Sequence, residues 1–154
     1  MDLIQNQEAE FAKLYKLYED YNSHTNISAI RDKAEVYAKH FEDSLSVVPY
    51  LEGQEIKVID VGTGGGFPAL PLAIVLPQAQ ITAIDSVGKK IRFIDQAKVE
   101  LKLENIEAIS CRAEELAHDQ DHRERYQVAV SRAVAELRII LEYCSSFVQP
   151  EGFV

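Results

Sequence analysis

Residues 56–68 read Ile56-Lys57-Val58-Ile59-Asp60-Val61-Gly62-Thr63-Gly64-Gly65-Gly66-Phe67-Pro68, and this stretch decides the fold. An apolar run that ends in an acid and continues into alternating glycines is typical of a buried strand breaking into a tight loop. Glycine allows positive φ and removes the β-carbon where a ligand approaches the backbone. A helix after the loop would hold a small ligand against the strand end. The stretch therefore predicts a ligand-binding strand–loop–helix unit.

The residues around the glycines indicate which ligand the loop holds. A P-loop needs Lys followed by Ser or Thr after its last glycine, and the NAD fingerprint needs glycine where Phe67 stands. Asp60, two residues before Gly62, would repel a pyrophosphate and attract an amino or sulfonium group. We therefore expect S-adenosylmethionine (SAM) rather than NAD or ATP, in contact with Asp60, Gly62 and Gly64.

Length and composition are those of one folded domain: the chain has 154 residues, of which 47% are hydrophobic. The first residues lack the pattern of a secretion signal, and the longest apolar stretch, 67–77, is too short to cross a bilayer. We expect a cytoplasmic monomer that binds no membrane and no metal. The net charge of −9 disfavours a nucleic-acid partner, but five basic residues between positions 89 and 102 allow a local basic face.

From residue 56 onwards, predicted strands and helices alternate. The strands are 56–61, 80–84, 106–111 and 127–131, and the helices are 67–76, 88–103, 113–118 and 133–147. This alternation predicts an α/β fold, a doubly wound and mostly parallel sheet with helices on both faces. Pro68 and Pro71 fall in the first turn of their helix, where they cost little. Residues 151–154 look like the start of a fifth strand, so we expect the C-terminal strands to be missing from this chain.

Residues 1–54 predict an N-terminal helical cap on a SAM-binding domain that spans residues 55–154. Apolar and tyrosine side chains at helical spacing predict a helix at 8–21, which the polar run 22–26 is expected to end. Asp32 followed by Glu35 resembles a capping box that opens a second helix at 33–51. We expect cap and domain to form one compact unit.

Asp85 ends the second predicted strand, about 20 residues after the first glycine of the loop. An acid at this place can accept hydrogen bonds from both hydroxyls of a ribose. Because the carboxyl ends of adjacent parallel strands share one edge of the sheet, Asp60 and Asp85 should lie on the same rim. We expect Asp85 to bind the ribose of SAM.

Six segments together resemble the bacterial family of 16S ribosomal RNA guanine-N7 methyltransferases, known as RsmG or GidB. They are Asn26-Ile27-Ser28-Ala29-Ile30, His40-Phe41-Glu42-Asp43-Ser44-Leu45, Asp60 through Leu72, Ile84-Asp85-Ser86-x-x-Lys89-Lys90-x-x-Phe93, Arg112-Ala113-Glu114-Glu115 and Ser131-Arg132-Ala133. The resemblance covers nearly the whole chain, and the Gly-Phe-Pro continuation and the Ser-Arg-Ala segment are its most specific parts. It implies SAM-dependent methyl transfer to N7 of a guanine in 16S ribosomal RNA of the small subunit.

The resemblance also implies SAM contacts at Gly62, Phe67, Ala113, Glu114 and Arg132. Ala113 and Glu114 follow the third predicted strand, where an adenine would lie. Arg132 follows the fourth, where the cofactor and the incoming base would meet.

The chemistry of the implied reaction makes few demands on side chains. Guanine N7 has a lone pair and no proton, so it can attack the methyl group in line without a general base. We therefore expect positioning to dominate and no dedicated catalytic residue, with Arg132 as the single candidate. Lys89, Lys90 and His40 are candidate RNA contacts. His40 and Asp43, one helical turn apart, suit a structural hydrogen-bonded pair equally well.

Two other functions stay open at this point. The glycine loop by itself is also compatible with a methyltransferase that acts on a small molecule or on a protein. A chain without the final strands of its sheet also suits a module that binds SAM without turnover.

Overall fold

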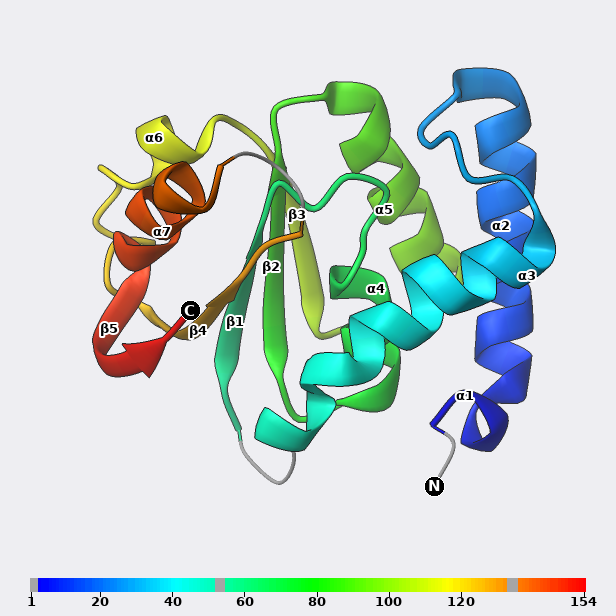
Figure 1. Ribbon diagram of the computed structural model, residues 1–154, viewed down its shortest axis with the longest axis horizontal. Helices are drawn as coiled ribbons and strands as arrows, with labels where there is room; N and C mark the ends of the chain where they lie inside the picture. The colour runs from blue at the N-terminus through cyan, green and yellow to red at the C-terminus, as the bar shows by residue number, and fades with distance from the viewer. Residues whose placement is uncertain (1–2, 52–54, 133–135) are drawn as a thin grey trace.

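The computed structural model describes residues 3–51, 55–132 and 136–154. Five strands form one parallel sheet in the order β3-β2-β1-β4-β5 (Figure 1). The strands are β1 Lys57–Val61, β2 Gln80–Asp85, β3 Ile106–Ser110, β4 Tyr126–Val130 and β5 Val148–Phe153. The predicted α/β class is confirmed, and the first four strands match their predicted bounds to within one residue. β5 begins three residues before the predicted fifth strand.

The predicted helices between the strands are also present, in shorter form. They are α4 Ala69–Val75, α5 Gly88–Glu100, α6 Ala113–Leu116 and α7 Leu137–Ser145. Pro68 occupies the N-cap position of α4 and Pro71 lies in its first turn, where the missing amide has no partner to lose. The predicted start of the last helix, at 133–135, lies outside the described residues.

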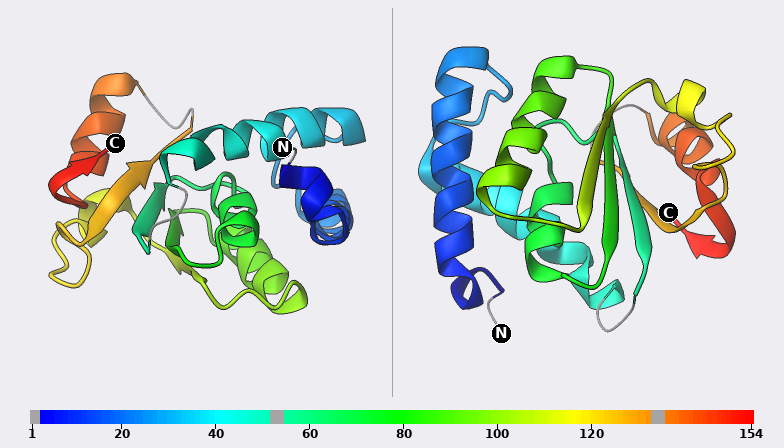
Figure 2. Two further views of the ribbon diagram at one scale, coloured as in Figure 1. Left: turned by 90° about the horizontal axis from the view of Figure 1, so that it is seen from below. Right: turned by 180° about the vertical axis from the view of Figure 1, so that it is seen from behind.

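Helices cover both faces of the sheet, because successive strand residues point to opposite sides (Figure 2). Val58 belongs to a large core cluster that joins one face of the sheet to α4, α5 and the N-terminal cap. Its neighbour Ile59 belongs to a smaller cluster on the other face, with Cys144 of α7 and Phe147. The sheet therefore separates two cores of unequal size.

The N-terminal cap consists of α1 Leu3–Asn6, α2 Glu8–Thr25, α3 Lys33–Glu35, the π-helix η1 Val36–Glu42 and the 3-10 helix η2 Leu45–Tyr50. α2 runs beside α5 at one end of the molecule, and α7 and β5 lie at the other end (Figure 1). Tyr21 and Tyr18 of α2 lie against Phe93 of α5, with ring centroids 5.2 and 6.3 Å apart. Aromatic packing therefore fixes the cap on the α5 side of the sheet. The domain boundary at residue 54 stays a prediction.

The prediction that α2 ends at residue 21 is wrong. Its polar continuation stays helical because the side chain of Asn22, which is 2% exposed, finds partners in the following loop. Its Nδ2 donates to the carbonyl of Ser28 at 2.9 Å, and its Oδ1 accepts from the Ser28 amide at 3.0 Å. The helix ends at Asn26, whose φ of 55° is left-handed.

The second predicted helix, 33–51, is present as one uninterrupted helical stretch over residues 33–50, within which the helix type changes from α to π to 3-10. Asp32 caps it as expected, since its carboxylate accepts from the Glu35 amide at 3.2 Å. The backbone then widens into η1 and tightens into η2, which contains Pro49. The π-helical segment carries His40 toward the sheet, as described below.

Replacing Asn22 by alanine should lower the free energy of unfolding by about 2 kcal/mol, because two buried hydrogen bonds to Ser28 are lost. Ser23→Ala on the next position is the matched control, since the Ser23 hydroxyl is exposed and bonds within its own helix. Urea unfolding of the three proteins measures the difference. Equal losses in the two variants would contradict a role for Asn22 in joining helix and loop.

Candidate functional site

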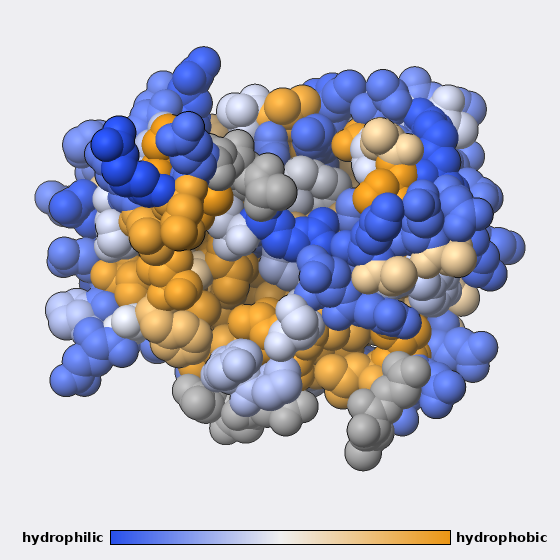
Figure 3. Space-filling model, in the orientation of Figure 1, coloured by the Kyte–Doolittle hydropathy of each residue, from blue (hydrophilic) through white to orange (hydrophobic). Residues whose placement is uncertain are grey.

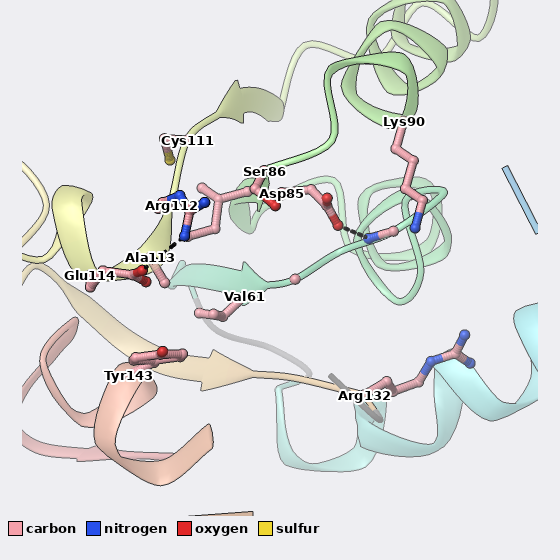
Figure 4. A pocket seen from close by; sticks show the side chains of 13 residues that line it. Val61, Asp85, Ser86, Lys90, Cys111, Arg112, Ala113, Glu114, Arg132 and Tyr143 are labelled. Atoms are coloured by element: carbon pink, nitrogen blue, oxygen red, sulfur yellow. Dashed lines mark hydrogen bonds and ion pairs between the residues drawn. The ribbon is translucent and has the colours of Figure 1, made fainter. Parts of the chain in front are cut away.

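A cavity of about 550 Å³ opens at the carboxyl ends of the strands, beside the point between β1 and β4 where the strand order reverses. Ligands of doubly wound sheets bind at such a switch point. Figure 4 shows the side chains that border this main cavity. Its lining residues are Val61, Gly62, Gly64, Ile84, Asp85, Ser86, Lys90, Cys111, Arg112, Ala113, Glu114, Arg132 and Tyr143. Six of the eight predicted cofactor residues are therefore brought together here.

The glycine loop forms the floor of the main cavity because its backbone turns back onto β2. The amides of Gly62 and Thr63 both donate to the carbonyl of Ile84, at 3.0 and 2.9 Å. Gly62 has a φ of 72°, which favours glycine. A β-carbon at Gly66 would lie 2.5 Å from Cδ1 of Leu70 in α4. Glycine at both positions lets the chain make the turn and still pack against α4.

Asp85 stands on the rim of the main cavity, at the end of β2. Its Oδ2 accepts a hydrogen bond from the Gly64 amide at 2.9 Å, drawn as a dashed line in Figure 4. Its Oδ1 accepts one from the Val87 amide, also at 2.9 Å. Each carboxylate oxygen keeps further acceptor capacity. The loop therefore holds the carboxylate in place while leaving it able to accept the hydroxyls of a sugar.

The first residues of α6 form a further wall of the main cavity. Ala113 and Glu114 both line it, and the Glu114 carboxylate lies 3.7 Å from the guanidinium of Arg112. The two charged side chains are 49% and 68% exposed, so the ion pair contributes only a few tenths of a kcal/mol, roughly. Glu114 is therefore free to turn toward a ligand.

Asp60 lies beneath the loop, which corrects the prediction that it faces the ligand. It has the strand parity of Val58, so its side chain points toward α4. The carboxylate is fully buried, and its Oδ2 accepts from the Thr63 hydroxyl at 2.6 Å and from the Ala69 amide at 3.1 Å. Within the described part of the chain, Oδ1 has no hydrogen-bond partner. Burial raises the pKa of Asp60 to about 7.

A small cavity of about 150 Å³ adjoins the main one, with Gly62, Gly64 and Arg132 common to both. Phe67 lines this small cavity rather than the main one, and it is only 4% exposed. Its ring stacks on the imidazole of His40, with centroids 4.5 Å apart and planes 7° from parallel. The other lining residues are Ile27, Ser28, His40, Thr63 and Gly65. Loop and cap therefore share this cavity.

Arg132 follows β4 directly and borders both cavities. Its guanidinium donates to the carbonyl of Lys39 at 2.6 Å, to Oδ2 of Asp43 at 2.9 Å and to Nδ1 of His40 at 3.1 Å. All three partners belong to the cap, about 90 positions earlier in the sequence. The sheet and the cap meet at this side chain. Ala133 of the predicted Ser-Arg-Ala segment lies outside the described residues.

His40 is 8% exposed, which disfavours the predicted direct contact with RNA. Its Nε2 lies 3.2 Å from the hydroxyl of Ser28. Burial, together with the charge of Arg132, lowers the pKa of His40 to about 4, although Asp43 acts in the opposite direction. The imidazole is therefore neutral near pH 7. The expected pair of His40 with Asp43 is replaced by a shared contact with Arg132.

The two lysines predicted to contact RNA have different surroundings. Lys89 donates to the carbonyl oxygens of Thr25 and Asn26, at 3.0 and 3.4 Å, where α2 ends. A cation is stabilised there by the partial negative charge of the helix C-terminus. Lys90 lines the main cavity. The structure thus gives Lys89 a structural use that the sequence did not suggest.

An apolar groove of about 440 Å³ lies on the other side of Arg132, between η2 and α7. Leu137 and Leu141 of α7 line it and are 71% and 45% exposed. Figure 3 shows hydrophobic surface gathered over α7 and β5. Arg132 therefore borders the main cavity, the small cavity and this groove.

Six lining residues of the main cavity were not predicted as site residues: Val61, Ile84, Ser86, Cys111, Arg112 and Tyr143. Val61 is the last residue of β1, and Ile84 is the last but one of β2. Ser86, Cys111 and Arg112 come one or two positions after β2 and β3, so reading just past each strand end would have found them. Tyr143 lies among apolar residues of α7, where no motif distinguishes it. Burial raises the pKa of the Cys111 thiol, which therefore stays protonated.

The described residues contain no group of three or more His, Cys, Asp or Glu side chains that could hold a metal ion. In the same ranges, none of the helices is both long and apolar enough to cross a membrane.

The architecture is the Rossmann-like fold of SAM-dependent methyltransferases. A crystal structure of a SAM-dependent methyltransferase from Aquifex aeolicus matches this chain with a TM-score of 0.62 and 18% sequence identity. The match covers 82% of this chain and 67% of that one. Identity at this level supports the shared fold alone.

The chain belongs to the family described as rRNA small subunit methyltransferase G (GidB), whose model matches residues 7–154. The protein called ribosomal RNA small subunit methyltransferase G in Acetivibrio thermocellus is 38% identical over 152 residues, which cover 99% of this chain and 63% of that protein. Its counterpart in Desulforamulus reducens is 40% identical over 153 residues, with coverages of 99% and 64%. The predicted family is confirmed. The chain spans less than two thirds of the length of these relatives.

Asp60 and His40 give the stability opposite pH dependences. The folded state holds the proton of Asp60 more tightly than the unfolded chain does, so its contribution is present below pH 3.8 and lost as the pH rises toward about 7. The folded state disfavours protonated His40, so its contribution is present above pH 6.5 and lost as the pH falls toward about 4. Over the same interval the two effects partly cancel.

Substituting either Asp60 or His40 should reveal the pH dependence of stability that the other residue causes. Between pH 4 and pH 7, the free energy of unfolding of Asp60→Asn should rise with pH, whereas that of His40→Phe should fall, each by on the order of 3 kcal/mol. The pH slope of the unchanged protein should lie between the slopes of the two variants. Urea unfolding at several pH values gives the curves. Parallel curves for the two variants would contradict the opposed shifts.

Proposed function

We propose that this chain binds SAM in the main cavity and that the protein transfers its methyl group to N7 of a guanine in 16S ribosomal RNA. The observation that carries the cofactor assignment is the arrangement of the Gly62–Gly64 backbone, Asp85 and Glu114 around one cavity at the switch point of the sheet. Its volume of about 550 Å³ lies within the usual range of ligand pockets. Membership of the rRNA small subunit methyltransferase G family supports the RNA substrate.

The residues that line the main cavity follow one another along the sheet edge, and each group of them suits a different part of the SAM molecule. Asp85 accepts the ribose hydroxyls with the lone pairs that Gly64 and Val87 leave open. Ala113 and Glu114 border the adenine. Gly62 and Gly64 let the methionyl part approach the backbone, next to Arg132.

The protein's contribution to the reaction is positioning. SAM, when bound, supplies a methyl group activated by a sulfonium. Guanine N7 attacks through its lone pair, so positive charge moves from sulfur to the base and no proton has to be transferred. The side chains must bring the two atoms into line and exclude water, which by itself can supply several kcal/mol, roughly. Arg132, at the junction of the cavities, is the residue best placed to orient the reactants.

We propose that Lys90, on the rim of the main cavity, contacts the RNA. Lys89 and His40 are less suited to a direct contact, because their side chains are already engaged within the fold. Because this chain has a net charge of −9, we propose that it contacts RNA through local basic side chains rather than through its overall charge. We further propose a monomer that acts in the cytoplasm, where ribosomal RNA is found.

Calorimetric titration of the 154-residue chain with SAM tests the cofactor, and labelled SAM with the complete gene product tests the substrate. We expect SAM binding by the chain and label at guanine N7 in isolated small subunits or in naked 16S ribosomal RNA. A folded, SAM-binding protein that labels neither RNA would overturn the substrate assignment and favour a small molecule or a protein. Binding by the chain without turnover, where the complete product is active, would make this chain a binding module.

Asp85→Asn should weaken SAM binding about tenfold or more, because one acceptor oxygen becomes a donor that faces the Gly64 amide and the ribose. Asp95→Asn, on the exposed face of α5, makes the same change of charge away from the cavity and serves as the control. Calorimetry at one ionic strength compares the two. Equal affinities in two folded variants would remove Asp85 from the cofactor site.

A further inference from the structure

Arg132 is held by the cap and not by its own sheet. Its guanidinium meets the Lys39 carbonyl, the Asp43 carboxylate and Nδ1 of His40. The Asp43 side chain is 57% exposed, and a solvated ion pair of this kind contributes little to holding a geometry. The contact with His40, which is 8% exposed, is much better shielded from water. Of the two side-chain partners, His40 therefore determines the direction of Arg132.

The imidazole of His40 is itself fixed on three sides. One face stacks on Phe67 with centroids 4.5 Å apart. Tyr18 of α2 presents an edge contact at 5.5 Å. Nε2 lies 3.2 Å from the Ser28 hydroxyl, which also accepts from the amide of Ile30 at 3.1 Å. The ring therefore cannot turn without breaking contacts with the glycine loop and with the cap.

The partners also determine the tautomer. A guanidinium carries donors only, so Nδ1 of His40 must accept from Arg132. The proton of the neutral ring then lies on Nε2 and points to Ser28. A second proton, on Nδ1, would make this nitrogen a donor facing an Arg132 donor, and it would place a positively charged imidazole beside the positively charged guanidinium. The arrangement needs neutral His40 in this single tautomer.

We infer that His40 is a positioning residue: its neutral imidazole, clamped between Phe67 and Ser28, directs Arg132 to the junction of the main and small cavities and so determines SAM affinity. The inference rests on the proposed function for its ligand. It also gives the N-terminal cap a part in cofactor binding, since the cap supplies both His40 and Ser28. His40 acts through Arg132 and need not touch the cofactor.

Two substitutions separate this role from mere packing. His40→Phe keeps an aromatic ring to stack on Phe67 but removes the acceptor for Arg132. His40→Asn removes the ring but offers an amide oxygen near the position of Nδ1. His24→Phe makes the first change at an exposed histidine of α2 and is the matched control.

The two His40 variants, made in the complete gene product, should show that SAM affinity and thermal stability change independently. We expect His40→Phe to keep the parental melting temperature but to bind SAM about tenfold more weakly, as for a lost hydrogen bond to a charged group. His40→Asn should melt earlier yet bind within about threefold of the parent. Parental affinity in His40→Phe, or weaker binding by His40→Asn than by His40→Phe, would overturn the inference.

Nitrogen NMR of the unliganded protein tests the arrangement without any cofactor. The signals of His40 near neutral pH should show a protonated Nε2 and an unprotonated Nδ1. A proton on Nδ1 would overturn the inference whatever the affinities. If the unchanged protein fails to bind SAM, the proposed function fails, and the NMR result still decides whether His40 accepts from Arg132.

Discussion

A buried carboxylate joins the central strand to the turn that follows it. Asp60 accepts from the hydroxyl of Thr63 within the loop and from the amide of Ala69 at the start of α4. Full burial makes the charged form costly, and only these bonds and the nearby Arg132 offset that cost. These bonds fix the position of the loop backbone. The Gly64 amide of the loop in turn holds the Asp85 carboxylate. The acid therefore shapes the cavity from below, without entering it.

The parts of the molecule that follow from local pattern could be predicted from the sequence, and those that depend on distant contacts could not. The alternation of strands and helices is enough to predict the parallel sheet. The position of Asp85 at the end of β2 is enough to predict that it lies on the rim of the cavity. The burial of Asp60 also follows from strand parity, although its nearness to the loop suggested otherwise. No pattern indicates that Lys89 caps α2, because its partners lie more than 60 positions away.

Segments that are far apart in the sequence build the small cavity together. The segments around Ser28, His40, the glycine loop and Arg132 are separate in the sequence but meet at the small cavity. Each therefore has a physical reason to keep its residue types: a hydroxyl acceptor, a neutral ring, a turn without β-carbons and a donor fork. The cap is part of the site rather than an appendage to it.

The unequal cores on the two faces of the sheet have a consequence for motion. The larger cluster ties the cap, α4 and α5 to one face, whereas the cluster under α6 and α7 contains far fewer buried side chains among the described residues. Local opening proceeds first where buried apolar contacts are fewest. Ala113 and Tyr143 stand on that thinner side, while the glycine loop packs against the thicker one. A ligand in the main cavity would thus contact two cooperative units that open at different free energies. Its binding would raise the free energy of opening of the less stable unit toward that of the more stable one.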